Sequence, residues 1–221
     1  LCRDGRRKNA IGGTIPPQIN LLRSLETLDL SDNEFEGSLP HLGDLAKLEF
    51  LDLGNAIGGN NLEGTLPDWL GKLTSLQSLL LADNRFEGRI PTLDKLVNLT
   101  HLDLSDNRLT GGVPDLRTLN RLEILSLGTL FGGNQLTGYV PDWLGQLSSL
   151  KNISIASQSV VDPDAGLAGR LPDLSALTNL QTLSLSGNRL SGEFPTWITS
   201  LPELQFVDFG VTFESDDGTI R

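Results

Sequence analysis

Residues 25–40, LETLDLSDNEFEGSLP, decide the fold because their pattern returns along the chain. It recurs as LQSLLLADNRFEGRIP at 76–91, LTHLDLSDNRLTGGVP at 99–114 and LQTLSLSGNRLSGEFP at 180–195. The central apolar residue of each triplet lies at Leu28, Leu51, Leu79, Leu102, Leu125, Ile153, Leu183 and Val207, at intervals of 23, 28, 23, 23, 28, 30 and 24 residues. Such a period predicts a solenoid whose coils cover one another.

Each triplet reads as a short strand with alternating inward and outward side chains. Leu28 and Leu30 point to the core, whereas Thr27, Asp29 and Ser31 point outward. Because a coil of about 23 residues supplies the long return path that parallel pairing requires, neighbouring strands are expected to pair in parallel. An Asn recurs after most of the strands, where its amide can satisfy turn backbone groups between coils. A Gly and a Pro follow it.

The full unit, LxxLxLxxNxLxGxIPxxLxxLxxL, resembles the leucine-rich repeat of the plant-type subclass over roughly residues 9–210. The resemblance implies an α/β solenoid, a right-handed superhelix with a concave parallel β-sheet, about 8–9 coils and a second short strand near the GxIP segment. Proteins of this kind include receptor-like protein and kinase ectodomains and polygalacturonase-inhibitor-like proteins. We expect a partial N-terminal cap and first repeat at 1–25, seven repeats at 26–204 with longer coils at 49–76, 123–150 and 151–180, and a terminal strand and tail at 205–221.

Composition excludes several classes of function. The net charge of −11 disfavours nucleic acid, whose phosphates require a basic face. One cysteine and two histidines leave no set of ligands for a Cys-ligated zinc site or a multi-His metal centre. No apolar run approaches the roughly 18 residues of a membrane span, and the charged start, LCRDGRRKN, does not read as a signal peptide. We expect neither metal nor cofactor.

The outward positions of the strands predict a binding face. Acidic residues concentrate in the first half of that face, and Ser, Thr and Asn in the second. This distribution favours a protein or peptide partner with basic character, although a solvated acidic face that aids solubility is the alternative. The predicted concave patch comprises Asp29, Phe50, Asp52, Leu80, His101, Asp103, Ile124 and Ser126.

Three coils carry insertions just after the strand, NAIGGNNL, TLFGGNQL and SQSVVDPDAGL. Their apolar residues either fold over the enlarged coil or line the rim of a binding surface, since insertions in solenoids gather on one face. The residues concerned are Ile57, Leu130, Phe131, Val160 and Val161. Trp69, Trp143 and Trp197 each follow a Pro by two residues, and we expect them to pack along the convex side.

No catalytic residue is predicted. His101, Asp103 and Ser105 alternate along one strand, roughly 6.6–7 Å apart at Cβ, which is too far for a nucleophile and its base. Asp29 and Asp52 could mimic the two carboxylates of a retaining glycosidase, but they lie on an open sheet without a pocket. The triplets that begin at Asn98 and Asn152 are candidate N-glycosylation sites, of which Asn98 is preferred because Asn152 lies on the strand face.

The sequence therefore predicts a non-enzymatic recognition module, secreted or at the cell surface, with an intracellular location as the alternative. A structural subunit of a larger assembly or cell wall and a secreted inhibitor of a cell-wall hydrolase stay open, since the fold does not choose among them. The paired terminal cysteines of the similar proteins are absent, apart from Cys2. We expect either a fragment or subunit of a larger protein or a cysteine-poor relative of those families.

Overall fold

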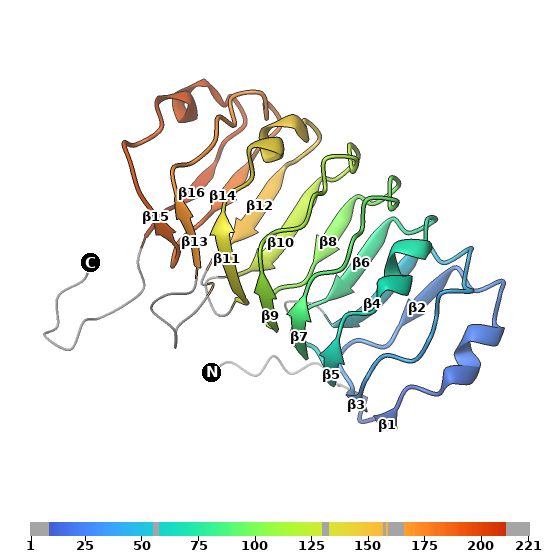
Figure 1. The fold of residues 1–221 in the computed structure, drawn as a ribbon. Helices are drawn as coiled ribbons and strands as arrows, with labels where there is room; N and C mark the ends of the chain where they lie inside the picture. Colours follow the sequence, from blue (N-terminus) through green and yellow to red (C-terminus); the bar gives the residue numbers. More distant parts are fainter. Residues whose placement is uncertain (1–8, 55–57, 130–132, 157, 159–165, 211–221) are drawn as a thin grey trace, which may run out of the picture.

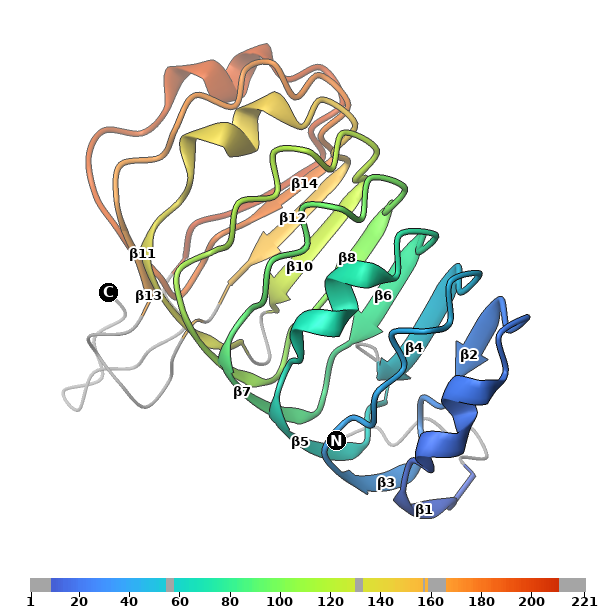
Figure 2. The same ribbon diagram turned by 45° about the vertical axis from the view of Figure 1, so that its right-hand side comes forward.

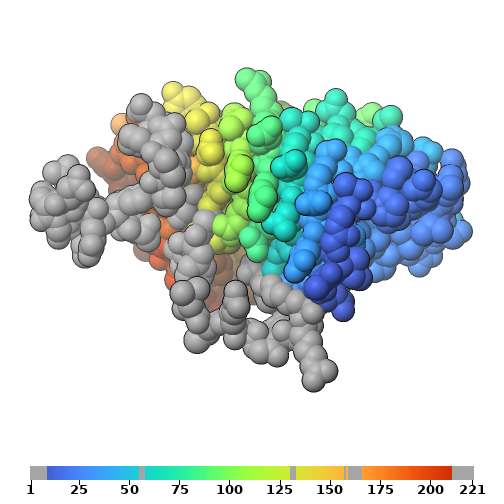
Figure 3. Space-filling model, turned by 90° about the horizontal axis from the view of Figure 1, so that it is seen from below, coloured from blue at the N-terminus to red at the C-terminus, as the bar shows by residue number. Residues whose placement is uncertain are grey.

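A computed structural model describes residues 9–54, 58–129, 133–156, 158 and 166–210. The predicted insertion residues Ile57, Leu130, Phe131, Val160 and Val161 lie outside these ranges. Successive coils stack in sequence order and form an arched solenoid (Figure 1). Seen from below, the same order appears as successive bands of atoms along the long axis (Figure 3). The predicted solenoid is confirmed.

Within the described ranges, the concave sheet contains eight parallel strands, one per coil. They are β2 (Thr27–Asp29), β4 (Phe50–Gly54), β6 (Ser78–Leu81), β8 (His101–Asp103), β10 (Ile124–Gly128), β12 (Asn152–Ile155), β14 (Thr182–Ser184) and β16 (Phe206–Asp208). Neighbours in this sheet are successive coils, so the order in space follows the order in sequence.

The second sheet confirms the short strand expected near the GxIP segment. It also has eight parallel strands, β1 (Gly12–Thr14), β3 (Glu34–Gly37), β5 (Asn61–Thr65), β7 (Arg85–Arg89), β9 (Arg108–Gly111), β11 (Gln135–Tyr139), β13 (Gly166–Gly169) and β15 (Arg189–Leu190). The same backbone conformation recurs in successive coils of this sheet. Gly64, Gly88 and Gly111 have φ of +83°, +74° and +80°, a left-handed conformation that glycine adopts without strain.

Among the described residues, four short 3₁₀ helices lie on the return segments, opposite the concave sheet (Figure 2). They are η1 (Pro17–Leu21), η2 (Asp68–Lys72), η3 (Asp142–Gln146) and η4 (Thr196–Ser200). The predicted packing of the tryptophans is confirmed for Trp69 and Trp143, which are 9 % and 8 % exposed, while Trp197 is half-buried.

An aliphatic core runs through the coils between the two sheets. The inward strand residues Leu51, Leu79 and Leu125 are fully buried, as are the leucines of the return segments such as Leu73 and Leu96. No single coil could bury its own leucines, so stability comes from the contact of each coil with its neighbours. Because the core uses the inward side chains, the outward side chains of the concave strands are available for contacts outside the core.

Candidate functional site

The register of the concave sheet assembles the predicted patch from separate coils. A first row of outward residues consists of Thr27, Phe50, Ser78, His101, Ile124, Asn152, Thr182 and Phe206. A second row, two residues further along each strand, consists of Asp29, Asp52, Leu80, Asp103, Ser126, Ser154, Ser184 and Asp208. All eight residues of the predicted patch therefore lie on five adjacent strands, β2, β4, β6, β8 and β10.

The acidic residues of the second row hold the ends of their own strands. The Oδ1 atom of Asp29 accepts the backbone N–H and the hydroxyl of Ser31, at 3.0 and 2.8 Å. Asp103 accepts the same two groups from Ser105, at 3.0 and 2.6 Å. Each carboxylate thus accepts a backbone N–H just beyond the end of its strand, the N–H of Ser31 or of Ser105. The alternation of side chains alone does not predict this role.

Asp52 departs from the prediction of an exposed contact residue. It is only 4 % exposed, and its Oδ1 accepts the N–H of Gly54 at 2.9 Å. Buried charge is tolerated only when it is hydrogen-bonded, which this contact supplies. Asp52 therefore stabilises the strand end and offers little surface to a partner, whereas the half-buried Asp103 stays accessible.

Three consecutive positions of the second row, Ser126, Ser154 and Ser184, carry serine where Asp29, Asp52 and Asp103 stand in earlier coils. Ser154 donates its hydroxyl to the carbonyl of Gly128 at 2.5 Å. Ser184 and Ser186 are 4 % and 1 % exposed, and their hydroxyls have no hydrogen-bond partner among the described residues. Since Ser replaces Asp at position 184, Ser186 lacks the acceptor that Ser105 has.

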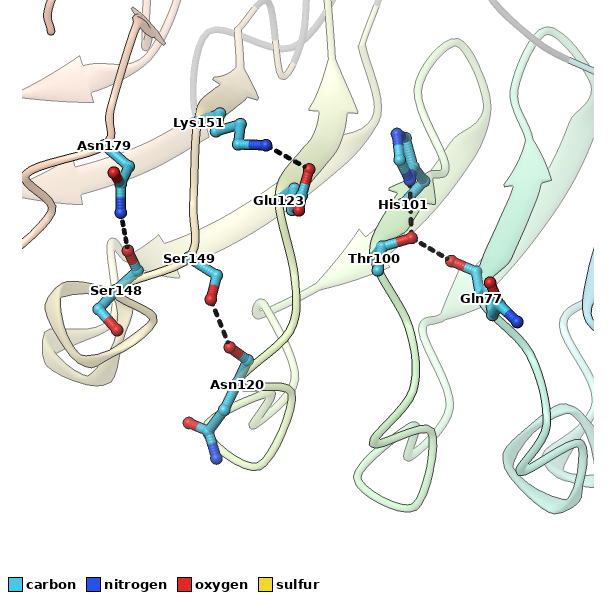
Figure 4. A network of polar contacts seen from close by, with 9 residues as sticks. All are labelled: Gln77, Thr100, His101, Asn120, Glu123, Ser148, Ser149, Lys151 and Asn179. Atoms are coloured by element: carbon cyan, nitrogen blue, oxygen red, sulfur yellow. Dashed lines mark hydrogen bonds and ion pairs between the residues drawn. The ribbon is translucent and has the colours of Figure 1, made fainter.

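The histidine of the patch does not form a catalytic pair with Ser105. Its Nδ1 lies 2.8 Å from Oγ1 of Thr100, and the hydroxyl of Thr100 donates to the carbonyl of Gln77 at 2.9 Å (Figure 4). The Oγ of Ser105 does reach Asp103, because side chains two residues apart can bend toward each other at a strand end, although their Cβ atoms stay apart. That contact belongs to the strand-end hydrogen bonds of Asp103, and the described contact of the histidine ring is with Thr100.

Two aspartates anchor the coil edges beside the insertions. Asp83 and Asp106 have φ of +52° and +51°, a left-handed conformation that Asp visits more readily than most residues. Asp83 accepts the N–H of Gly59 at 3.0 Å, and Asp106 accepts the hydroxyl of Thr129 at 3.3 Å. Burial raises the pKa of Asp106, the hydrogen bond from Thr129 opposes that shift, and the nearby negative charges of Asp83 and Asp103 add to it.

An amide ladder links the coils behind the concave strands. In the second long coil, Asn134 accepts the N–H of Leu109 at 2.9 Å and donates to the carbonyls of Leu104 and Leu127 at 2.9 and 2.8 Å. The third long coil has no Asn at this position, and sequence reasoning missed its substitute. Gln158 is fully buried and continues the ladder, with donations to the carbonyls of Leu127 and Ala156.

A polar strip borders the concave sheet where its strands begin. Gln77 donates to Glu49 at 2.9 Å, and Lys151 pairs with Glu123 at 2.7 Å (Figure 4). The hydrogen bond from Lys151 lowers the pKa of Glu123. A hollow of about 310 Å³ opens in this strip, lined by Glu49, Ser75, Gln77, Asn98, Thr100 and Arg121. All six of these residues are polar or charged.

The two candidate glycosylation sites have different surroundings. The amide of Asn98 is held at both ends: it donates to the carbonyl of Thr74 and accepts from Arg121, each at 3.1 Å. Asn152 lies half-buried in the first row, between Ile124 and Thr182. A glycan at Asn152 would lie on the concave face, and one at Asn98 would replace the contact with Arg121. Both sites stay predictions.

The described residues contain no group of three His, Cys, Asp or Glu side chains placed to hold a metal ion. Within those same ranges, no helix combines the length and apolar character needed to cross a membrane.

Comparison with known proteins adds a consistent set of relatives. A family model described as "Leucine-rich repeat region" matches residues 41–218, and one described as "Leucine Rich Repeat" matches 24–45. The chain is similar to Receptor like protein 24 of Arabidopsis thaliana, with 31 % identity over 189 residues, 84 % of this chain and 18 % of the relative. It is 34 % identical to Receptor-like protein 35 of the same plant over 210 residues, which cover 90 % of this chain and 19 % of that one.

Solved structures show the same likeness. The crystal structure of a TDR receptor is 37 % identical, with a TM-score of 0.80, over 91 % of this chain and 33 % of the receptor. The Arabidopsis receptor kinase HAESA, in complex with the peptide hormone IDA and the co-receptor SERK1, is 31 % identical, with a TM-score of 0.73, over 97 % of this chain and 34 % of that one. The chain thus spans less than a fifth of those two curated relatives and about a third of the solved receptors.

Proposed function

The chain belongs to the leucine-rich repeat family, and from that premise we propose that it is a non-catalytic recognition segment of a receptor-like ectodomain. Its ligand is a peptide or protein that binds on the concave face. The HAESA complex supports this proposal, because a similar receptor is seen there with a peptide hormone. A location at the cell surface or outside the cell belongs to the same proposal.

The observation that carries the proposal is the continuous patch on the open concave sheet. Phe50, Leu80 and Ile124 are half-buried apolar residues that face outward from β4, β6 and β10. The three strand spacings from β4 to β10 span about 14 Å, which matches four or five residues of an extended peptide. Covering these side chains removes apolar area from water without any change of the fold.

Charge favours a partner with basic side chains. Asp29 lies on β2, one strand before Phe50, and Asp103 lies on β8 beside Leu80. Within the described ranges neither carboxylate forms an ion pair with a cation. Their hydrogen bonds to the strand end fix the carboxylates in place, so little side-chain entropy is lost when a cation binds. A lysine or arginine of the partner would find both charge and a preset acceptor there.

The test is selection of ligands from a phage-displayed library of random dodecapeptides. We expect enrichment of peptides that combine basic and apolar residues, with binding measured by isothermal titration calorimetry. The double variant Phe50→Ala/Ile124→Ala should weaken the affinity of a selected peptide at least tenfold. Val97→Ala, which changes a residue that is 49 % exposed on the return segment, is the matched control and should leave affinity unchanged.

Two outcomes would reject the proposal. Peptides that bind both the double variant and the wild type equally would show that the patch is not the binding surface. Failure of the library to yield any concave-face ligand, together with stable self-assembly or inhibition of a cell-wall hydrolase, would favour the scaffold or the inhibitor function instead.

A further inference from the structure

The hydrogen bonds around His101 decide which of its two ring nitrogens carries the proton. The Nδ1 atom lies 2.8 Å from Oγ1 of Thr100, and that hydroxyl donates to the backbone carbonyl of Gln77 at 2.9 Å (Figure 4). A hydroxyl group has one proton to donate and two lone pairs that accept. Since the carbonyl takes the proton, Nδ1 must itself donate to Oγ1, and the neutral ring therefore carries its proton on Nδ1.

The other nitrogen of the ring is left as an acceptor. In this tautomer the lone pair of Nε2 points out from the opposite edge of the ring. Among the described residues, Nε2 has no hydrogen-bond or ion-pair partner. His101 is half-buried in the first row, between Ser78 on β6 and Ile124 on β10. A ligand on the concave patch would therefore meet a hydrogen-bond acceptor at this position.

A carboxylate stands beside this acceptor on the same strand. Asp103 follows His101 by two residues in β8, so both side chains leave the strand on the same face. The Oδ1 atom of Asp103 accepts two hydrogen bonds from Ser105, and within the described ranges Oδ2 has no hydrogen-bond or ion-pair partner. Glu123, whose carboxylate also feels the histidine ring, is bound by Lys151 at 2.7 Å. Nε2 of His101 and Oδ2 of Asp103 thus form a pair of acceptors open to a ligand.

We propose that His101 is a specificity-determining residue that selects an arginine side chain of the ligand, with Thr100 as its positioning residue. The inference rests on the proposed function, because it concerns a peptide on the concave patch. The Cβ atoms of His101 and Asp103 are roughly 6.6–7 Å apart. A guanidinium group presents five N–H donors in a planar fork, so it donates to Nε2 with one edge and to Asp103 with another. A lysine carries its donors on a single nitrogen and suits the carboxylate alone.

The opposite tautomer would select a different ligand. With its proton on Nε2, the ring would present a donor at this position and would exclude the donors of a guanidinium group. The ligand would then need an acceptor, such as a backbone carbonyl. The hydroxyl of Thr100 therefore decides whether the patch offers an acceptor or a donor beside Asp103, although Thr100 itself does not contact the ligand.

Nitrogen-15 NMR of the free protein tests the tautomer without any ligand. The chain has two histidines, so a long-range ¹H–¹⁵N spectrum at about pH 8.5, where histidine is ordinarily neutral, contains two ring patterns, and His41→Gln assigns them. We expect His101 to show a protonated Nδ1 and an unprotonated Nε2. Thr100→Val keeps the shape of the side chain without its hydroxyl and should give a mixture of tautomers. Thr100→Ser restores a hydroxyl and should restore the wild-type pattern.

Isothermal titration calorimetry tests the selection of arginine. The ligand is a peptide selected on the wild-type protein from the dodecapeptide library, and each of its arginines is replaced in turn by lysine. One of these replacements should weaken binding about tenfold, since it leaves Nε2 unpaired. In Thr100→Val the same replacement should change the affinity by less than about twofold. His41→Gln changes the histidine outside the patch, and this matched control should keep the tenfold preference.

Three results would overturn the proposal. They are a proton on Nε2 of His101 in the wild type, selected peptides that lack arginine or tolerate lysine in its place, and an arginine preference that persists in Thr100→Val once the tautomer has changed. Circular dichroism shows whether Thr100→Val is folded, and Thr100→Ser gives the same comparison with a smaller change.

The variant Phe50→Ala/Ile124→Ala separates failure of this inference from failure of the proposed function. A peptide that tolerates lysine but loses affinity in that variant rejects the arginine selection and leaves the concave patch as the binding surface. A peptide that is insensitive to that variant rejects the proposed function, and the arginine selection is rejected with it.

Discussion

Two adjacent asparagines allow a direct test of the amide ladder. Asn60 lies behind the concave sheet and joins two coils, whereas Asn61 begins β5 and points to the surface. The variants Asn60→Ala and Asn61→Ala remove the same amide from neighbouring positions. Only the first should lower the free energy of unfolding strongly.

The expected magnitudes follow from the hydrogen bonds. Asn60 accepts the N–H of Phe35 at 3.0 Å and donates to the carbonyls of Leu30 and Leu53 at 3.0 and 2.8 Å. Losing three part-buried bonds and leaving the N–H of Phe35 unpaired should cost about 3–5 kcal/mol. Asn61 accepts one exposed bond, from Arg85 at 2.8 Å, so its loss should cost less than about 1 kcal/mol.

The measurement is urea unfolding followed by circular dichroism and by tryptophan fluorescence. Both probes are needed, because a solenoid can lose its coils in stages and a single free energy then has no defined meaning. If the two probes give coincident unfolding transitions, the free energies of unfolding of the two variants can be compared. If the two variants differ by less than about 1 kcal/mol, the amide ladder does not hold the coils together and the reasoning is refuted.

Three further comparisons test other contacts. Ser105→Ala should lower the free energy of unfolding by about 1.5–3 kcal/mol, since it loses a bond to a charged group, whereas Ser186→Ala should leave it unchanged or higher in the same urea assay. Because burial raises the pKa of Asp106, the folded state binds the proton more tightly than the unfolded state, and stability falls as pH rises through that pKa. Asp106→Asn should therefore stabilise the protein at pH 7 but not near pH 3, and an equal effect at both would contradict the assignment. Gly54→Ala would place a Cβ 2.1 Å from a carbonyl oxygen of the next coil and should cost about 3 kcal/mol, whereas Gly112→Ala, whose Cβ meets nothing closer than 3.8 Å, should cost less than about 1 kcal/mol by thermal unfolding.

Much of the fold could be predicted from the sequence, because it depends on a repeated alternation of apolar residues. Leu28 and Leu51 identify inward positions, and Phe50 and Ile124 identify outward ones, by spacing alone. The parallel sheets and the membership of the two rows followed from that spacing. The binding role of the patch remains a prediction that the peptide selection tests.

Other features of the site could not be predicted from one coil. The burial of Asp52 depends on its surroundings in the assembled sheet. Gln158 reaches the ladder only because its longer side chain spans the altered position in the third long coil. A glutamine close to the expected asparagine was the available signal, and its meaning became clear once the adjacent coils were in place.

By itself, the sequence determined the repeat, the inward leucines and the outward rows, because these are set by local alternation and by intervals of 23–30 residues. Only the tertiary structure decided which outward groups stabilise the solenoid and which stay available to a ligand. Asp29 and Asp52 occupy the same position in their coils, yet Asp29 is exposed and Asp52 is only 4 % exposed. The difference arises from the surroundings that form when coils stack, and the pattern within a single coil does not encode them.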